Sequence, residues 1–141
     1  MGLDSGFDGA AFITGVNQNM GELATTMGVA LTEASPQRLV ATMPVPGNRQ
    51  PYGLLHGGAN AVLAETIGSI HCALLAPDGT FPVGIELSCS HHRSARDGTV
   101  TAVCEPISSG KTLATMSITI TDDDEQLCCT ARLTCLFRPA N

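Results

Sequence analysis

Hydrophobic and polar residues alternate along this chain with two different periods, which separate predicted strands from one predicted helix. In the C-terminal half, apolar residues recur at every second position, as in half-buried β-strands, over residues 83–89, 99–105, 112–121 and 127–137. Two shorter predicted strands, 29–34 and 38–45, flank a turn of Ser, Pro and Gln and form a hairpin.

A long helix is predicted between the hairpin and the later strands. Residues 58–76 contain no proline, and Leu63, Ile67, Ile70 and Leu74 share one helical stripe. The other faces carry mostly small residues, so we expect this helix to be covered on nearly all sides. The order of hairpin, long helix and four-stranded meander predicts an α+β fold, in which an antiparallel sheet of five to six strands wraps around one long central helix.

Composition narrows the class of protein. The 141 residues fit a single domain over 21–141, preceded by a weakly patterned extension, 1–20, that forms a short helix or is loosely held. Hydrophobic residues make up 43% and charged residues 14%, which excludes disorder, and the net charge of -6 argues against nucleic-acid binding. Without a signal-peptide pattern or a pure apolar span, the expected location is cytoplasmic, with no membrane partner.

The cysteines suggest neither a zinc site nor a disulfide framework. The six residues form no C-x-x-C pair and lie near no suitably spaced histidines. Four of them fall on the apolar phase of predicted strands, where reduced thiols pack as small core residues: Cys89, Cys104, Cys129 and Cys135.

Glu65 is the most conspicuous candidate for chemistry. It lies in the middle of the apolar helix, and ionised carboxylates are seldom buried without a partner or a task. It is a candidate base or nucleophile, although an interface ion pair or a solvent-facing position would also accommodate it. Ser69, one helical turn later, lies on the same face and could hold the carboxylate or an attacking water.

The start of the helix offers hydrogen-bond donors. His56, Gly57 and Gly58 mark the entry from a loop, and free amides at a helix N-terminus suit a carbonyl oxygen that becomes an oxyanion. A Gly-Gly entry alone is more often turn chemistry. Gln50, earlier in the same loop, could reach the same carbonyl.

Basic residues concentrate in the C-terminal part of the chain. His91 and His92 precede a short segment with Arg93 and Arg96, and residues 108–111 add serines, a glycine and a lysine. This skew suggests an anion site for a phosphorylated ligand. The chain has no G-x-S-x-G elbow, Walker loop or Rossmann glycine pattern, and its acidic run 122–125 reads as a turn.

The segment 50–69 carries Gln50, a His-Gly-Gly run and a Leu-Ala-Glu-Thr-Ile-Gly-Ser run. On these residues it resembles hotdog-fold acyl-CoA thioesterases. Within them it is similar to the Glu-dependent 4-hydroxybenzoyl-CoA and 1,4-dihydroxy-2-naphthoyl-CoA thioesterase branch. His91, residues 93–98 and residues 127–134 extend the likeness over roughly residues 20–138. The resemblance implies a homodimer with paired sheets, a tetramer, and an active site between subunits.

The resemblance also implies site roles. Glu65 would be the nucleophile or general base, Gly57 the backbone donor to the thioester oxygen, and Ser69 the partner of the water or carboxylate. Gln50 and His56 would orient the acyl group, and the remaining implied substrate contacts are Gly58, His91 and, for the CoA nucleotide, Arg93, Ser109, Gly110 and Arg138. No metal or organic cofactor is implied, since coenzyme A belongs to the substrate.

Three functions stay open at this point. The first is hydrolysis of an acyl-CoA with an aromatic or medium-chain acyl group. The aromatic content of 4% leaves few rings to stack on an aryl group, and His92 stands where relatives carry an apolar residue. The alternatives are a hotdog acyl-CoA hydratase or dehydratase, with His56 and Glu65 as acid and base, and an acyl-CoA-binding module without turnover.

Overall fold

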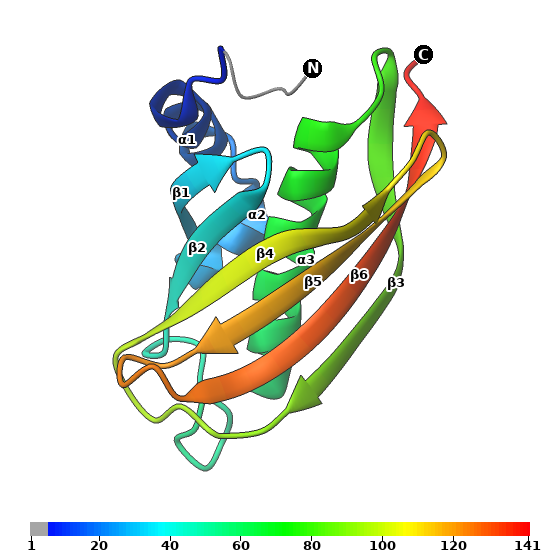
Figure 1. Cartoon of the computed structure of the whole chain (residues 1–141). Coiled ribbons are helices and arrows are strands. Elements are labelled where there is room, and N and C mark those ends of the chain that lie inside the picture. The colour runs from blue at the N-terminus through cyan, green and yellow to red at the C-terminus, as the bar shows by residue number, and fades with distance from the viewer. Residues whose placement is uncertain (1–5) are drawn as a thin grey trace.

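The structure is a computed structural model that describes residues 6–141. Three helices and six strands follow one another as two short helices, a hairpin, a long helix and four further strands (Figure 1). The elements are α1 (Gly9–Gln18), α2 (Glu22–Met27), β1 (Ala30–Ser35), β2 (Arg38–Pro44), α3 (Gly57–Leu75), β3 (Thr80–His91), β4 (Thr99–Ser109), β5 (Leu113–Thr121) and β6 (Leu127–Pro139).

One antiparallel sheet holds all six strands, in the order β1-β2-β4-β5-β6-β3. Figure 1 shows this sheet curving around α3, which lies against its concave face. The predicted α+β fold, with one central helix inside an antiparallel sheet, is therefore confirmed.

The predicted meander of four consecutive strands is wrong in one respect. Of the last four strands, only β4, β5 and β6 are neighbours in chain order, whereas β3 pairs with β6 and β4 pairs with β2. A period-two pattern identifies a strand but not its partner, and the segment between β3 and β4 crosses the end of the sheet instead of forming a hairpin.

The register of β3 also differs from its sequence pattern. A β-bulge between Gly84 and Glu86 shifts the pairing with β6, so Val83 and Ile85 do not continue the inward face of Leu87 and Cys89. Ile85 is 57% exposed, and Phe81 and Val83 are exposed as well. The edge strand β3 therefore carries apolar side chains that nothing within residues 6–141 covers.

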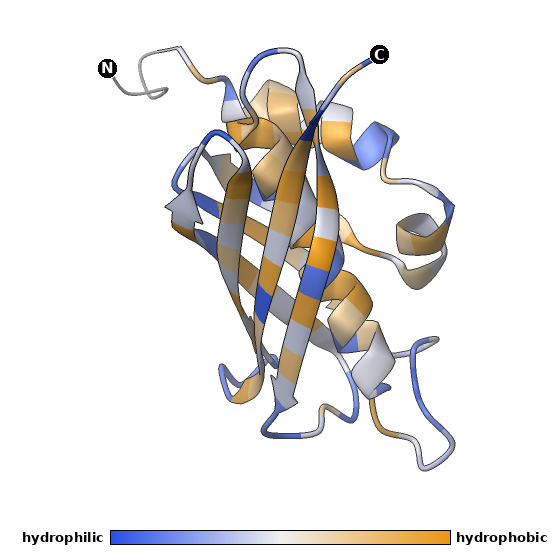
Figure 2. Ribbon diagram, turned by 90° about the vertical axis from the view of Figure 1, so that its right-hand side faces the viewer, coloured by the Kyte–Doolittle hydropathy of each residue, from blue (hydrophilic) through white to orange (hydrophobic). Residues whose placement is uncertain are grey.

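The core lies between α3 and the sheet. Leu63, Ala64 and Ile67 of α3 are fully buried, and they face inward residues of β4, β5 and β6 such as Met116 and Leu133. Figure 2 shows the alternation of apolar and polar positions along the strands that this packing requires. Among the helices of residues 6–141, α3 is long and apolar enough to cross a membrane by length and composition, but here it is the central helix of a packed domain.

The opposite edge of the sheet is covered by α1. Asn17 bonds both backbone groups of Leu31 in β1, accepting from its N–H at 2.8 Å and donating to its carbonyl at 2.9 Å. Gly9 allows α1 to approach β1 closely, because a Cβ at this position would lie only 2.7 Å from the carbonyl oxygen of Ala34. The weakly patterned N-terminal segment thus contains a capped helix, with Asp8 as its N-cap.

His71 makes stability depend on pH. It is fully buried in α3, with Nε2 2.8 Å from the Pro36 carbonyl oxygen and Nδ1 3.4 Å from Sγ of Cys104. Desolvation lowers its pKa from the ordinary value of 6.5. Below that value the unfolded chain binds the extra proton more readily than the folded one, so lowering the pH favours unfolding.

We therefore expect the free energy of unfolding to fall as the pH drops through and below about 6.5, by no more than about 1.4 kcal/mol per pH unit from this group. Urea unfolding of the wild type, His71→Gln and the exposed-site control His92→Gln measures it. The H71Q protein should lose less stability on acidification than the other two. Equal losses in all three proteins would show that His71 is not the titrating group.

Candidate active site

The start of α3 is built so that one backbone amide stays available. His56 is the N-cap, and its Nδ1 accepts from the Gly58 amide at 2.8 Å. The amides of Ala59 and Asn60 donate to the His56 carbonyl. Within residues 6–141 the Gly57 amide has no acceptor, so of the four helix-start amides it is the one free to bind an incoming oxygen.

A cavity of about 380 Å³ surrounds this amide and contains Gln50 and His91. Oε1 of Gln50 accepts from the backbone amides of Tyr52 and Leu54, which fixes the carboxamide and leaves its Nε2 as the outward donor. The His91 ring lies against Gly57, since a Cβ on that glycine would be 3.3 Å from Nε2. The structure thus brings Gln50, Gly57 and His91 of one chain together.

Glu65 and Ser69 share a second cavity, of about 680 Å³, between α1 and α3. The Glu65 side chain is exposed in the single chain, so its expected burial is not found there. Its carboxylate lies over the edge strand, because a Cβ on Gly84 of β3 would be only 3.2 Å from Oε1. The carboxylate is therefore at the uncovered margin of the sheet, beside the exposed apolar residues of β3.

One chain does not bring the carboxylate to the free amide. Gly57 and Glu65 are two turns apart on the same helix, a separation of about 12 Å along its axis, and they line different cavities. Within one chain, the Glu65 carboxylate and the Gly57 amide therefore do not face a common cavity.

The cysteines are packed into the core and are not exposed nucleophiles. Five of the six are buried, and Cys89 is half-buried. Burial raises the pKa of the Cys104 and Cys129 thiols to about 12 in each case, so both are neutral at pH 7. These thiols are core residues, as their sequence phase predicted.

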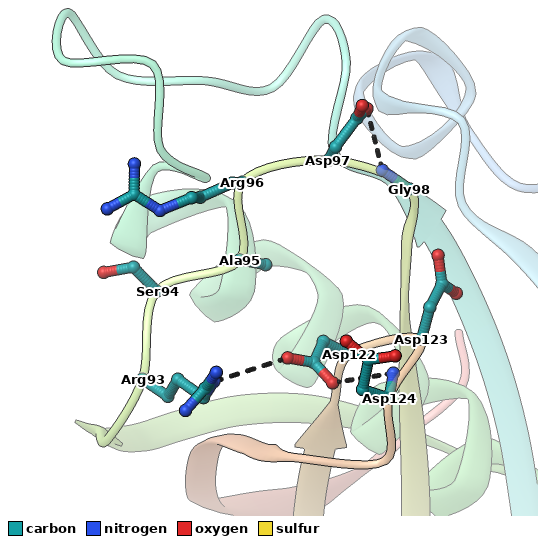
Figure 3. A pocket seen from close by; sticks show the side chains of 9 residues that line it. All are labelled: Arg93, Ser94, Ala95, Arg96, Asp97, Gly98, Asp122, Asp123 and Asp124. Carbon is teal, nitrogen blue, oxygen red and sulfur yellow. Dashed lines mark hydrogen bonds and ion pairs between the residues drawn. The ribbon is translucent and has the colours of Figure 1, made fainter.

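A third cavity lies beside the segment that follows β3. Figure 3 shows Arg93 directed toward Asp122, with Nε 3.6 Å from Oδ2, while Arg96 points away from the aspartates. Oδ1 of Asp122 accepts two backbone amides of its own turn, and Oδ2 of Asp123 accepts from the Thr99 amide. The acidic run is therefore a turn, as predicted.

The predicted nucleotide contacts do not gather within one chain. In the β3–β6 ladder, Arg138 pairs with Phe81 at one end and His91 pairs with Cys129 at the other. Ser109 and Gly110 lie at the Arg138 end, close to the start of β5, whereas Arg93 follows His91. His92 points elsewhere, to the Thr130 hydroxyl at 2.8 Å.

Two contributions to these cavities were missed by sequence reasoning. Asn60 lines the Gln50–Gly57 cavity, is only 5% exposed, and has an Oδ1 without a partner within residues 6–141. The sequence signal for Asn60 was a side-chain amide within an otherwise apolar stretch of the predicted helix. The second is α1 together with the residue Met20 just after it. Phe12, Val16 and Met20 line the Glu65 cavity, and their spacing of four residues was the available signal.

Comparison with known proteins places this arrangement in a family. The model of the Thioesterase superfamily matches residues 52–129, which include the helix and most of the sheet. A proofreading thioesterase, EntH, from Cronobacter turicensis is 44% identical over 116 residues, covering 82% of this chain and 85% of that protein.

Solved structures agree with the sequence relatives. Thioesterase HI1161 from Haemophilus influenzae has a TM-score of 0.88 and 33% identity, covering 99% of this chain and 96% of that one. SAV0944 from Staphylococcus aureus has a TM-score of 0.81 and 36% identity, covering 84% of this chain and 100% of that one. The chain belongs to the thioesterase superfamily and is a thioesterase of the hotdog fold.

Proposed function

We propose that this thioesterase hydrolyses an acyl-CoA, with an aromatic or medium-chain acyl group, to the free acid and coenzyme A. The observation that carries the proposal is Glu65, the only charged residue of α3, placed with Ser69 at the wall of a largely apolar cavity. A carboxylate beside an apolar acyl site is suited to attack, or to direct water at, an activated carbonyl.

In the proposed reaction the Gly57 amide and Nε2 of Gln50 donate to the thioester oxygen and stabilise the negative charge that develops there. The Glu65 carboxylate then follows one of two routes. As a nucleophile it attacks the carbonyl carbon, expels the CoA thiolate and leaves an anhydride that water hydrolyses. As a general base it takes a proton from water, whose oxygen attacks the carbon before the thiolate leaves.

Both groups reach one carbonyl if two chains pair along β3. The outer edge of this long strand has no partner strand within residues 6–141, and the strand exposes Phe81, Val83 and Ile85, whereas α1 covers the other edge of the sheet. Exposed apolar edges favour association, and a two-fold axis makes the contact self-complementary. Because Glu65 lies over β3, such a dimer would place it near the partner's helix start. The tetramer stays a prediction.

The same antiparallel pairing would bring the Arg93 end of one chain toward the Arg138 end of its partner. This is the arrangement that the proposed nucleotide contacts need: Arg93, Ser109, Gly110 and Arg138. His56, through its bond to the Gly58 amide, acts in this proposal as a positioning residue for the helix start. His91 lines the cavity beside the proposed thioester position, and Gly58, which does not line that cavity, stays a predicted substrate contact.

A relative gives independent support for the choice of residues. SAV0944 was crystallised with a glutamine and, separately, with a glutamate replaced by alanine. In that chain the two replaced positions are separated by the same number of residues as Gln50 and Glu65 in this one. The proposed mechanism uses side chains and backbone alone, without metal or cofactor, and the proposed location is the cytoplasm.

Release of free thiol from acyl-CoA substrates tests the function. The purified protein is assayed with a thiol reagent against benzoyl-, phenylacetyl- and straight-chain acyl-CoA esters, and with enoyl-CoA followed by its absorbance. We expect thiol release from at least one aromatic or medium-chain ester. Loss of enoyl absorbance without thiol would support a hydratase instead, and tight binding without turnover across the panel would support a binding module.

A further inference from the structure

The cavity that holds Glu65 has two helical walls of similar length. Lining residues run from Ala11 along α1 to Met20, just past its end, and from Glu65 to Ala73 on α3. The helical parts of the two walls are about 10 Å and about 12 Å long. The volume of about 680 Å³ lies within the usual range for small-molecule sites. The matched family segment, 52–129, contains the α3 wall but not the α1 wall.

The α1 wall is apolar and held in place. Phe12, Val16 and Met20 face the cavity and also pack on the core. Two contacts fix α1 against β1. Asn17 forms hydrogen bonds with both backbone groups of Leu31, and Gly9 lies against the carbonyl of Ala34. A fixed apolar wall opposite the carboxylate limits what can extend from a carbonyl held at Glu65.

We propose that α1 is the wall that sets the length of the acyl group, and that the occupant of this cavity is the apolar tail of the thioester substrate. This inference rests on the proposed function for the position of the carbonyl at Glu65. An extended chain advances roughly 1.1 Å per bond, as a strand backbone does, so walls of this length accommodate about ten carbons.

Gly15 offers a clean way to shorten the cavity. It lines the cavity from the middle of α1, and a Cβ added there would meet no atom within 4 Å. In Gly15→Leu the new side chain enters the space of the acyl group without a clash, and leucine favours the helix more than glycine does. Thr14→Leu is the matched control, since Thr14 is exposed and does not line the cavity.

The experiment measures binding of non-hydrolysable S-alkyl-CoA thioethers, from methyl to dodecyl, by calorimetry. For the wild type and T14L, affinity should rise by about fourfold per methylene until the cavity is full. For G15L the rise should stop several carbons earlier, so that decyl-CoA binds at least tenfold more weakly than to wild type while methyl-CoA binds within twofold. Phe12→Ala should extend the rise to longer chains.

Parallel affinity series for G15L and wild type, or an equal loss at every chain length, would overturn the inference. The two claims fail separately. A wild type that shows the length-dependent series but hydrolyses no acyl-CoA would overturn the proposed function and leave the α1 wall intact. Conversely, the wild type could hydrolyse acyl-CoA with a chain-length preference that neither G15L nor F12A alters. That result would overturn the role of the α1 wall and leave the proposed function intact.

Discussion

Replacing Glu65 with glutamine should lower kcat for hydrolysis of benzoyl-CoA, or of the best acyl-CoA found, by at least about 10³-fold. The amide keeps the size of the carboxylate but can neither attack a carbonyl nor accept a proton from water. Removal of a single oxyanion donor costs about 10² to 10³, and the group that forms or activates the nucleophile should cost more. Thiol release at saturating substrate measures the effect.

The loss should be confined to chemistry. Glu65 is exposed in the single chain, so the variant should keep the wild-type fold and change the free energy of unfolding by no more than about 0.5 kcal/mol. Glu22→Gln, an exposed carboxylate in the first turn of α2, is the matched control and should retain full activity. Near wild-type turnover by E65Q would remove the carboxylate from the mechanism.

Replacing Gly57 with proline should lower kcat by about 10² to 10³ while leaving the protein folded. Gly57 is the first residue of α3, where proline is well tolerated, and the lost N–H is the helix-start amide without an acceptor in the described chain. His56 has φ -62° and ψ 130°, a conformation that a following proline accepts. Steady-state kinetics measures the loss of kcat, and thermal unfolding tests whether the variant stays folded.

Gly57→Ala separates the amide from the added side chain. Alanine places a Cβ in the same position, 3.3 Å from the His91 ring, but retains the N–H. We expect G57A to keep most of the activity that G57P loses. If both variants lose activity equally, the defect comes from displacement of His91 and not from the missing hydrogen-bond donor.

The fold was predictable from sequence where local pattern decides it. The long helix was predicted at 58–76 and is found at Gly57–Leu75, because an apolar stripe without proline ends at Pro77. Strand order was not predictable, because a period-two pattern shows which face of a strand is buried but not which strand lies beside it. The bulge beside Gly84 likewise left Ile85 exposed, which no period-two count indicates.

The candidate site also has features that the sequence predicted and features that it did not. Gln50 and Gly57 were expected to meet because one loop and one helix start connect them, and they share a cavity. Glu65 and Ser69 were expected on one helical face, and they share another. What sequence could not show is that the two groups are separate within a chain, or that α1, from a weakly patterned segment, forms a wall beside the carboxylate. Both depend on packing between distant segments.

Mixing two inactive proteins tests most directly whether Glu65 of one subunit acts with the Gly57 amide of another. E65Q and G57P, each inactive alone, are dissociated together in equal amounts and reassociated. If the site is shared, half of the dimers are mixed, each with one intact site, and activity returns to about a quarter of the wild-type value. If mixed dimers are shown to form and activity stays at the level of the parent variants, the site is not built across two subunits.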